Sequence, residues 1–254
     1  MTGRTLRAVF FDMDGLIIDT ETLDFRAWQE ALAEHGYTLS MDEWIAAVGT
    51  WDMLDGMYDA VGVPANERQS IRDEKRTRYM AMVRADMHPL PGFTDLLADL
   101  RARYVTVAVV STASRDWVDL ILGEMGIADQ FAFTLSGSDV ERGKPEPDLY
   151  LLACKRAGVA AEECLVLEDS ANGVLAASRA GIAVVAVPNG ITRVQSFEHA
   201  SARVDSLEAV NAGLLAESGL ALPAAPGTSN VHEIPHEWIV AAGREAIARG
   251  GHGQ

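Results

Sequence analysis

Short apolar runs that alternate with glycine-terminated helical patterns place the strongest constraint on the fold of this chain. The last four runs are separated by helical patterns, and each pattern stops at a glycine, a common residue just past a helix. This alternation predicts right-handed crossovers and a parallel sheet with helices on both faces. We therefore expect an α/β fold with a Rossmann-like, doubly wound core. The runs are Leu6–Phe11, Val105–Val110, Phe131–Thr134, Leu165–Leu167 and Val184–Val187, and the helical patterns are Trp117–Met125, Leu149–Ala157 and Val174–Ala180.

The rhythm changes between the first two runs, because residues 20–86 contain no convincing strand pattern. This stretch leaves the core just after the first strand and returns at Pro89–Gly92. We expect it to be an inserted α-helical cap domain, since its length lies within the range of a small domain. Its helical patterns are Thr20–His35, a helix opened by the capping box Ser40–Glu43, Asp52–Val61 and Asn66–Arg84.

The expected domain organisation has three parts. Residues 1–18 and 88–222 form the catalytic core, and residues 19–87 form the helical cap. Residues 223–254 form a linker and a C-terminal extension, whose role the sequence does not indicate; the pattern at Trp238–Ala248 is that of a short helix.

Composition excludes several classes of function. The 254 residues carry a formal net charge of −16 and show no basic stripe, which argues against nucleic acid as a partner. No apolar stretch is long enough for a signal region or a membrane span, so we expect no membrane association. The two cysteines, Cys154 and Cys164, form no Cys-x-x-Cys pair, and we expect reduced thiols in a cytoplasmic protein.

Two carboxylates stand immediately after the first apolar run. Asp12 and Asp14 follow Phe11, and Gly15 then frees the backbone to turn. Acids just past a buried strand are costly unless a cation or another partner faces them. In an open α/β sheet, groups at this end of a strand usually line a ligand crevice. A helix-capping or turn aspartate explains one of these acids, but explains the pair with the glycine poorly.

Three further segments fall where strands end. Ser111 and Thr112 offer hydroxyl and backbone donors for an oxyanion or phosphate, although a helix cap explains them equally well. Lys144 is clamped between Gly143 and Pro145, and a solvated lysine is the alternative. Glu168 and Asp169 follow the fourth run and precede Ser170, Ala171, Asn172 and Gly173. Two acidic clusters on neighbouring strands suit Mg²⁺, and the whole set suits phosphoryl transfer.

Together these segments resemble the motifs of the haloacid dehalogenase superfamily, in its β-phosphoglucomutase-like branch with a helical cap. The resemblance covers roughly residues 5–215 and rests on Asp-x-Asp-Gly, Ser/Thr, Lys-Pro and Glu-Asp in this order. It implies Asp12 as nucleophile and Asp14 as general acid and base. It implies that Ser111, Thr112 and Lys144 bind phosphate. It further implies Mg²⁺ held by Asp12, the Asp14 carbonyl and Asp169, with Glu168 beside or behind it, and a monomer.

The branch contains phosphatases and sugar-phosphate mutases, and the mutases hold a second phosphate with a cap arginine and a histidine. Here an acid replaces each of these residues, at Asp52 of the Gly49–Asp52 stretch and at Asp24. We therefore expect a phosphatase acting on a small sugar phosphate or nucleotide-like ester, with a mutase as the alternative. Three residues are candidates for binding the substrate: Glu21, Asn172 and Trp51. Glu21 belongs to the sequence Asp-Thr-Glu, the form seen in phosphatases of the branch. Trp51 could stack on a substrate ring, although a place in the hydrophobic core of the cap accounts for it slightly better.

Three other functions are less well supported. The His232–His236 pattern resembles a zinc-protease helix, but Pro235 within it disfavours a helix. A dehalogenase would lack the second acid, and Asp14 is present. A non-catalytic binding protein with this fold should have lost the nucleophile or the metal acids, and all are intact here.

Overall fold

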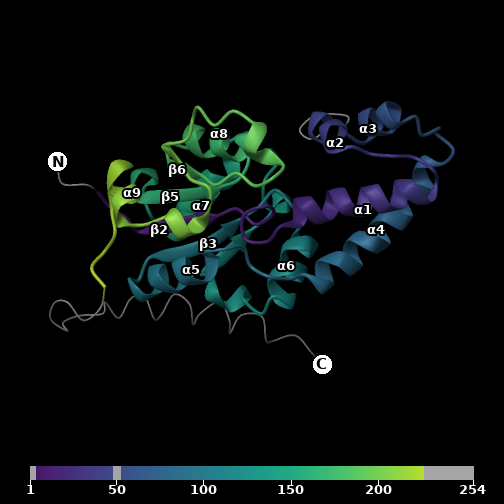
Figure 1. Cartoon of the computed structure of the whole chain (residues 1–254). Helices are drawn as coiled ribbons and strands as arrows, with labels where there is room; N and C mark the ends of the chain where they lie inside the picture. The colour runs from purple at the N-terminus through teal and green to yellow at the C-terminus, as the bar shows by residue number, and fades with distance from the viewer. Residues whose placement is uncertain (1–3, 48–52, 226–254) are drawn as a thin grey trace, which may run out of the picture. The chain divides into compact units, whose positions relative to one another are not determined.

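A computed structural model describes residues 4–47 and 53–225 of the chain (Figure 1). Its contacts group residues 1–223 into one compact unit and residues 224–254 into a second. Several sequence predictions fall outside the described residues: the cap stretch Gly49–Asp52 with Trp51, the His232–His236 pattern and the Trp238–Ala248 helix.

The first unit is built on a six-stranded, all-parallel sheet with the strand order β4-β3-β2-β5-β6-β7. Each of the five predicted runs contributes a strand, which confirms the α/β class. Strand β2 lies in the middle, where Phe11 pairs in register with Val109 of β3 and Leu167 of β5. The strands are β2 (Ala8–Phe11), β3 (Thr106–Val110), β4 (Phe133–Leu135), β5 (Cys164–Glu168), β6 (Ala183–Ala186) and β7 (Ala202–Arg203); a separate parallel pair joins β1 (Arg4–Thr5) to β8 (Leu220–Ala221).

Alternate strand residues point to opposite sides of the sheet, and both sides are apolar. Helices therefore cover both faces. Val9 and Phe11 belong to the cluster on one face, and Ala8 and Phe10 belong to the cluster on the other. Helices α5 (Phe93–Ala102) and α6 (Arg115–Glu124) supply the first cluster, while α7 (Asp148–Ala157) and α8 (Ala171–Arg179) supply the second. Shorter elements are α9 (Ala212–Glu217) and the 3₁₀ helices Ala128–Gln130, Gly137–Asp139, Ala161–Glu163, Thr192–Val194 and Leu207–Ala209.

Helix α5 was not predicted from the sequence. It starts after Gly92, which adopts a φ of +84° and offers no side-chain cap. A side chain at this position would collide with the backbone of Glu208, since an added Cβ would lie 2.2 Å from its nitrogen. The helix therefore begins at a tight backbone contact rather than at a capping residue that the sequence would reveal.

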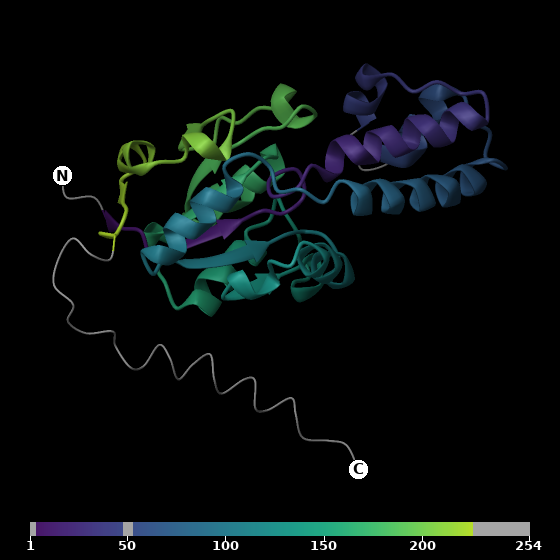
Figure 2. The same ribbon diagram turned by 60° about the horizontal axis from the view of Figure 1, so that its bottom comes forward.

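Between β2 and β3 the chain forms helices only, in the described part of residues 20–86. Helices α1 (Thr20–Glu34) and α4 (Arg68–Ala85) run antiparallel side by side, as Figures 1 and 2 both show. Helices α2 (Met41–Ala47) and α3 (Met53–Val61) lie alongside α1 on the side away from α4. The capping box at Ser40 is present, with Glu43 and Ser40 bonding each other's backbone nitrogens.

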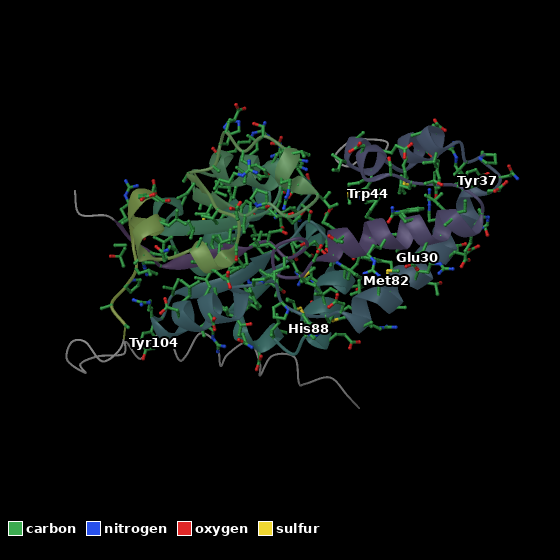
Figure 3. All side chains as sticks on the ribbon, viewed as in Figure 1. Glu30, Tyr37, Trp44, Met82, His88 and Tyr104 are labelled. Carbon is green, nitrogen blue, oxygen red and sulfur yellow. The ribbon has the colours of Figure 1, made fainter. Side chains whose placement is uncertain are left out.

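These helices have a hydrophobic cluster of their own, to which Phe25, Trp28, Trp44, Tyr58 and Ile71 belong. The Trp44 side chain points from α2 towards α1 (Figure 3), and its ring lies 6.0 Å from that of Phe25. We refer to α1–α4 as the helical insertion. Its division from the core as a separate cap domain stays a prediction.

None of the helices in the described residues combines the length and the hydropathy of a membrane span. The two cysteines are free thiols, with their sulfur atoms 3.9 Å apart.

Candidate active site

Residues from distant segments meet at the carboxyl edge of the sheet. Asp12 follows β2, Ser111 follows β3 and Asp169 follows β5. The chain first winds outwards through β3 and β4 and then returns to β5 on the other side of β2, so this edge is the switch point where open α/β sheets bind ligands. A pocket of about 210 Å³ opens there.

Eight of the ten predicted site residues line this pocket. They are Asp12, Asp14, Glu21, Ser111, Thr112, Lys144, Asp169 and Asn172. Of the other two, Glu168 lies behind the pocket wall with no exposed surface, and Trp51 falls outside the described residues. Convergence of strand ends was the basis of the prediction, and the structure brings these segments together.

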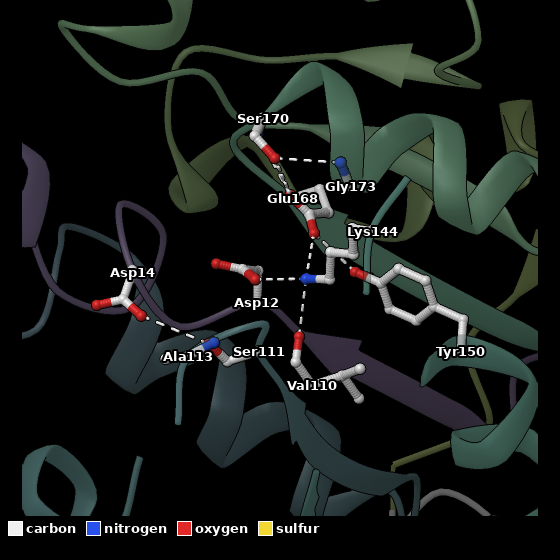
Figure 4. Close-up of polar contacts among 10 residues, drawn as sticks. All are labelled: Asp12, Asp14, Val110, Ser111, Ala113, Lys144, Tyr150, Glu168, Ser170 and Gly173. Atoms are coloured by element: carbon white, nitrogen blue, oxygen red, sulfur yellow. Dashed lines mark hydrogen bonds and ion pairs between the residues drawn. The ribbon is translucent and has the colours of Figure 1, made fainter. Parts of the chain in front are cut away.

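Lys144 lies at the centre of the buried charges (Figure 4). Its ammonium donates to Asp12 Oδ1 at 2.5 Å, Glu168 Oε1 at 2.6 Å and the Val110 carbonyl at 2.9 Å. Burial alone would lower the pKa of Lys144, but the two carboxylates outweigh it and raise the pKa well above its usual value. The lysine is therefore a fixed positive charge at the pocket wall rather than a solvated side chain.

Asp12 is buried beside this lysine, and burial raises the pKa of its carboxyl group to about 8 although Lys144 pulls it down. Lys144 binds only Oδ1, and Oδ2 has no protein donor among the described residues. Such a carboxylate has one oxygen held and one oxygen exposed to a ligand. Its nucleophilic form is favoured further by any cation placed near it.

Asp14 occupies a different environment, with three side-chain donors around it. Thr20 and Trp117 both donate to Oδ1 at 2.9 Å, and Ser111 donates to Oδ2 over 3.4 Å. Burial raises the pKa of Asp14, and these hydrogen bonds oppose the rise. A carboxyl group that takes up a proton at higher pH than usual suits a general acid and base.

Asp169 lies against Gly15 and Asn189. Its Oδ2 accepts from the Asn189 amide at 2.8 Å. Gly15 adopts a φ of +80°, and a Cβ there would lie 2.4 Å from Asp169 Oδ2, so only glycine lets the loop pass this close. Burial and then the nearby Asp12 and Glu168 raise the pKa of Asp169 well above its usual value.

The carboxylates fit a hard divalent cation. Asp12, Glu168 and Asp169 each offer an oxygen within 4.8 Å of the others, and all three are buried. Among the described side chains, Lys144 is the one cation that contacts this group, so the three carboxylates share a single positive charge. Buried carboxylates that outnumber their cations are costly unless a further positive charge is present. Carboxylate oxygens are also the ligands that Mg²⁺ prefers.

Glu168 is the member of this group with the most protein partners. Besides Lys144, it accepts from the Tyr150 hydroxyl at 2.8 Å and from the Ser170 hydroxyl at 3.0 Å. Gly173 closes over it, because a Cβ there would lie 1.9 Å from the Glu168 carboxyl group. These contacts favour the second of the two predicted places for Glu168, behind the cation rather than beside it.

The sequence model of one protein family, the haloacid dehalogenase-like hydrolases, matches residues 6–181 of this chain. The chain belongs to this family. Its membership confirms the resemblance seen in the sequence and the expectation of an enzyme of the phosphomonoester hydrolase class, and it sets aside a binding protein without activity.

Two curated relatives and one solved structure of the family illustrate the similarity. YhcW of Bacillus subtilis, whose name places it among phosphatases, is 34% identical over 215 residues, which are 83% of this chain and 96% of YhcW. The phosphorylated carbohydrates phosphatase of Thermotoga maritima is 30% identical over 183 residues, covering 70% of this chain and 82% of that protein. A Deinococcus radiodurans family hydrolase crystallised with phosphate and sodium is 29% identical, with a TM-score of 0.70 over 87% of this chain and all of that one.

In this hydrolase the helical insertion supplies one acid to the pocket. Burial raises the pKa of Glu21 to about 7, and the neighbouring Asp14, Asp24 and Asp19 add to the rise. Asp24 does not stand as a free negative charge, as the sequence interpretation assumed, because the Lys75 ammonium of α4 binds it. That interpretation overlooked Lys75, since the two residues lie 51 positions apart.

Three further site residues were not singled out from the sequence. Tyr150 supports Glu168, Asn189 supports Asp169, and Trp117 donates to Asp14. Tyr150 and Trp117 lie within two of the predicted helical patterns, and Asn189 follows the last apolar run. The only available signal was their position just past a strand end or near the start of a helix that follows one.

Proposed function

We propose that this chain is a Mg²⁺-dependent phosphatase that hydrolyses a small phosphomonoester through an aspartyl-phosphate on Asp12. One observation carries the proposal: Asp12, Asp14, Ser111, Lys144 and Asp169 line a single pocket at the carboxyl edge of the sheet. The nucleophile, the acid, the oxyanion donors and the cation are the parts that phosphoryl transfer needs.

The carboxylates of Asp12 and Asp169 and the main-chain carbonyl of Asp14 would hold the Mg²⁺ ion. When bound, the ion neutralises charge on the phosphoryl oxygens. Lys144 adds a second positive charge on the Asp12 side, and the Ser111 hydroxyl and the backbone that follows it supply hydrogen-bond donors. Glu168 keeps Lys144 in place rather than binding the ion, since its oxygens already accept from three side chains.

In the first step the free oxygen of Asp12 attacks phosphorus, and the bond from phosphorus to the ester oxygen breaks. Asp14 gives its proton to that oxygen, so the leaving group departs as an alcohol. In the second step a water molecule attacks phosphorus and gives its proton to Asp14. The bond between phosphorus and the Asp12 oxygen then breaks, which releases inorganic phosphate and restores the carboxylate.

A pocket of about 210 Å³ accommodates a phosphate with a compact leaving group, which supports a small-molecule substrate. The named activity of the Thermotoga maritima relative favours a sugar phosphate. A mutase needs a cation for a second phosphate, and the Lys75 ammonium is already bound by Asp24 and lies over the rings of Trp28 and Tyr79. These contacts support hydrolysis over the mutase alternative.

A substrate panel with and without Mg²⁺ tests the proposal. The panel contains sugar phosphates, nucleotides and pseudouridine phosphate, and both released phosphate and isomerised sugar phosphate are measured. We expect phosphate release from at least one sugar phosphate, a loss of about 100-fold or more after chelation, and recovery with Mg²⁺. Isomerised product would favour the mutase, and full activity after complete metal removal would contradict the proposal.

A further inference from the structure

Trp117 is the one aromatic side chain that donates a hydrogen bond to the acid–base carboxylate in the described residues. Its indole nitrogen lies 2.9 Å from Asp14 Oδ1, although 103 positions separate the two residues. Trp117 stands in the first turn of α6, just after the Ser111 loop, and it is half-buried. The proposed mechanism assigns it no role.

A second aromatic ring holds Trp117 from the opposite element. Tyr79 of α4 stacks on it, with ring centroids 5.5 Å apart and planes inclined by 22°. Both rings pack against the hydrophobic cluster that contains Val9 and Phe11. The Lys75 ammonium lies 4.5 Å from the centre of the Tyr79 ring and holds this ring in turn. The indole is therefore clamped between the core and the helical insertion.

The donor type decides what this contact does to Asp14. An indole N–H donates and never accepts, so the oxygen that faces it must be an acceptor. Oδ1 receives both this bond and the bond from Thr20. The proton of a neutral Asp14 is thereby directed to Oδ2. The only described side chain that bonds Oδ2 is Ser111, whose hydroxyl lies 3.4 Å away and can rotate.

We propose that Trp117, braced by Tyr79, is a positioning residue that fixes the Asp14 carboxyl group with its transferable proton on Oδ2. The inference rests on the proposed function and adds a part to it: acid catalysis depends on an aromatic contact between the core and the helical insertion. Without the indole N–H, the Thr20 hydroxyl is the remaining described side-chain partner of Oδ1, and because a hydroxyl can also accept, the proton can then move to Oδ1.

Comparing substrates with different leaving groups tests the role of Trp117. If Trp117 were only structural, its loss would slow the hydrolysis of both substrates equally. Nitrophenolate leaves without a proton, whereas a sugar alkoxide requires one, so only the sugar ester depends on the acid. The value of kcat/KM covers the steps up to departure of the leaving group. Substrates for the test are p-nitrophenyl phosphate and the best sugar phosphate from the panel above.

Trp117→Phe removes the N–H and keeps an aromatic ring. We expect kcat/KM to fall about 10-fold for the sugar phosphate, the size of one net hydrogen bond, and by less than about 2-fold for the aryl phosphate. Tyr79→Leu should produce the same selective loss at about 3-fold, because it removes only the stacking partner. Trp44→Phe is the matched control: its buried indole nitrogen has no partner among the described residues, and both rates should stay unchanged.

Measurements in Asp14→Asn protein distinguish a failure of the proposed role of Trp117 from a failure of the acid–base role of Asp14. If Trp117 acts through Asp14, adding Trp117→Phe to Asp14→Asn should cause no further loss with the sugar phosphate. An equal loss for both substrates, or a further loss in this background, would overturn the role of Trp117. If Asp14→Asn alone leaves hydrolysis of the sugar phosphate intact, the acid–base assignment fails instead, whatever Trp117 does.

Discussion

The edge of the sheet and the helical insertion differ in how deeply their ion pairs are buried. At the sheet edge Lys144 is 4% exposed and its partner Glu168 is not exposed at all, so each depends on the other. In the helical insertion the ion pairs lie nearer the surface, as with Arg78 and Glu34, whose side chains are 30% and 56% exposed. Buried pairs fix geometry at a large desolvation cost, whereas surface pairs contribute little.

The contrast indicates a division of labour. The core supplies the groups that the proposed mechanism uses, and most of them lie just past strand ends. The insertion adds Glu21 to the pocket lining, and it holds the Lys75–Asp24 pair outside that lining. Changes in the core should therefore remove activity, and changes in the insertion should alter stability and selectivity.

The largest expected effect is on catalysis in the core. Asp12→Asn removes the nucleophile, and we expect kcat to fall by roughly four orders of magnitude or more while the circular dichroism spectrum is kept. Asp129→Asn, at an exposed aspartate of the short helix Ala128–Gln130, is the matched control and should behave as the wild type. Near-normal activity of Asp12→Asn would remove the basis for the whole assignment.

The second prediction compares the two lysines directly. Lys144→Met leaves the carboxylates of Asp12 and Glu168 buried without their cation, and should lower the free energy of unfolding by about 3–5 kcal/mol. Lys75→Met breaks a pair whose side chains are 14% and 25% exposed, and should cost about 1 kcal/mol. Urea unfolding of both variants, without added metal, measures the difference. Equal costs would show that the two regions do not differ in the way described.

The third prediction concerns the pH dependence of stability. Burial, followed by three neighbouring acids, raises the pKa of Glu21 from 4.5 to about 7 in the folded protein. The folded state therefore keeps a proton that the unfolded state loses, so stability falls as the pH rises through this interval. Glu21→Gln removes the penalty and should raise the free energy of unfolding above pH 7 by roughly 2 kcal/mol, with no gain below pH 4.5.

Glu124→Gln, at an exposed position of α6, is the control for Glu21→Gln and should shift neither limb of the profile. A gain for Glu21→Gln that is equally large at acidic pH would mean that the substitution improves packing instead. In that case Glu21 does not carry the charge penalty assigned to it.

The smallest expected effect is at the start of α2. Ser40→Ala removes the capping box with Glu43, and we expect a loss of about 1 kcal/mol in unfolding free energy and no change in kcat/KM. Thr38→Ala, two residues earlier and exposed, is the control. A change in kcat/KM beyond that of the control would show that this part of the insertion acts on the active site.

Much of the core was predictable because local patterns and sheet topology determine it. Asp12 and Asp169 follow buried strands, and parallel strands in this order must bring their carboxyl ends together. Gly15 was predicted to let the backbone turn and does adopt a φ of +80°, whereas its close approach to Asp169 is seen only in the structure. Helix α5 was missed because its start depends on a backbone contact with Glu208 and not on a cap.

The contacts of the insertion were not predictable by the same reasoning. The pairing of Lys75 with Asp24, and of Trp117 with both Tyr79 and Asp14, joins residues that no strand register or helix period relates. Each of these side chains also has an ordinary explanation, as a surface charge or a core aromatic. Only the folded arrangement shows which explanation holds.

Trapping of the phosphorylated enzyme tests the central claim most directly. In Asp14→Asn protein with Mg²⁺ and p-nitrophenyl phosphate, the first step needs no acid and the second step lacks its base, so the intermediate should accumulate. Acid quenching, digestion and mass spectrometry should then find one phosphoryl group on the peptide that contains Asp12, and none in Asp12→Asn protein. Release of nitrophenol with no phosphoryl group on Asp12, or with the group on Ser111 instead, would contradict the account.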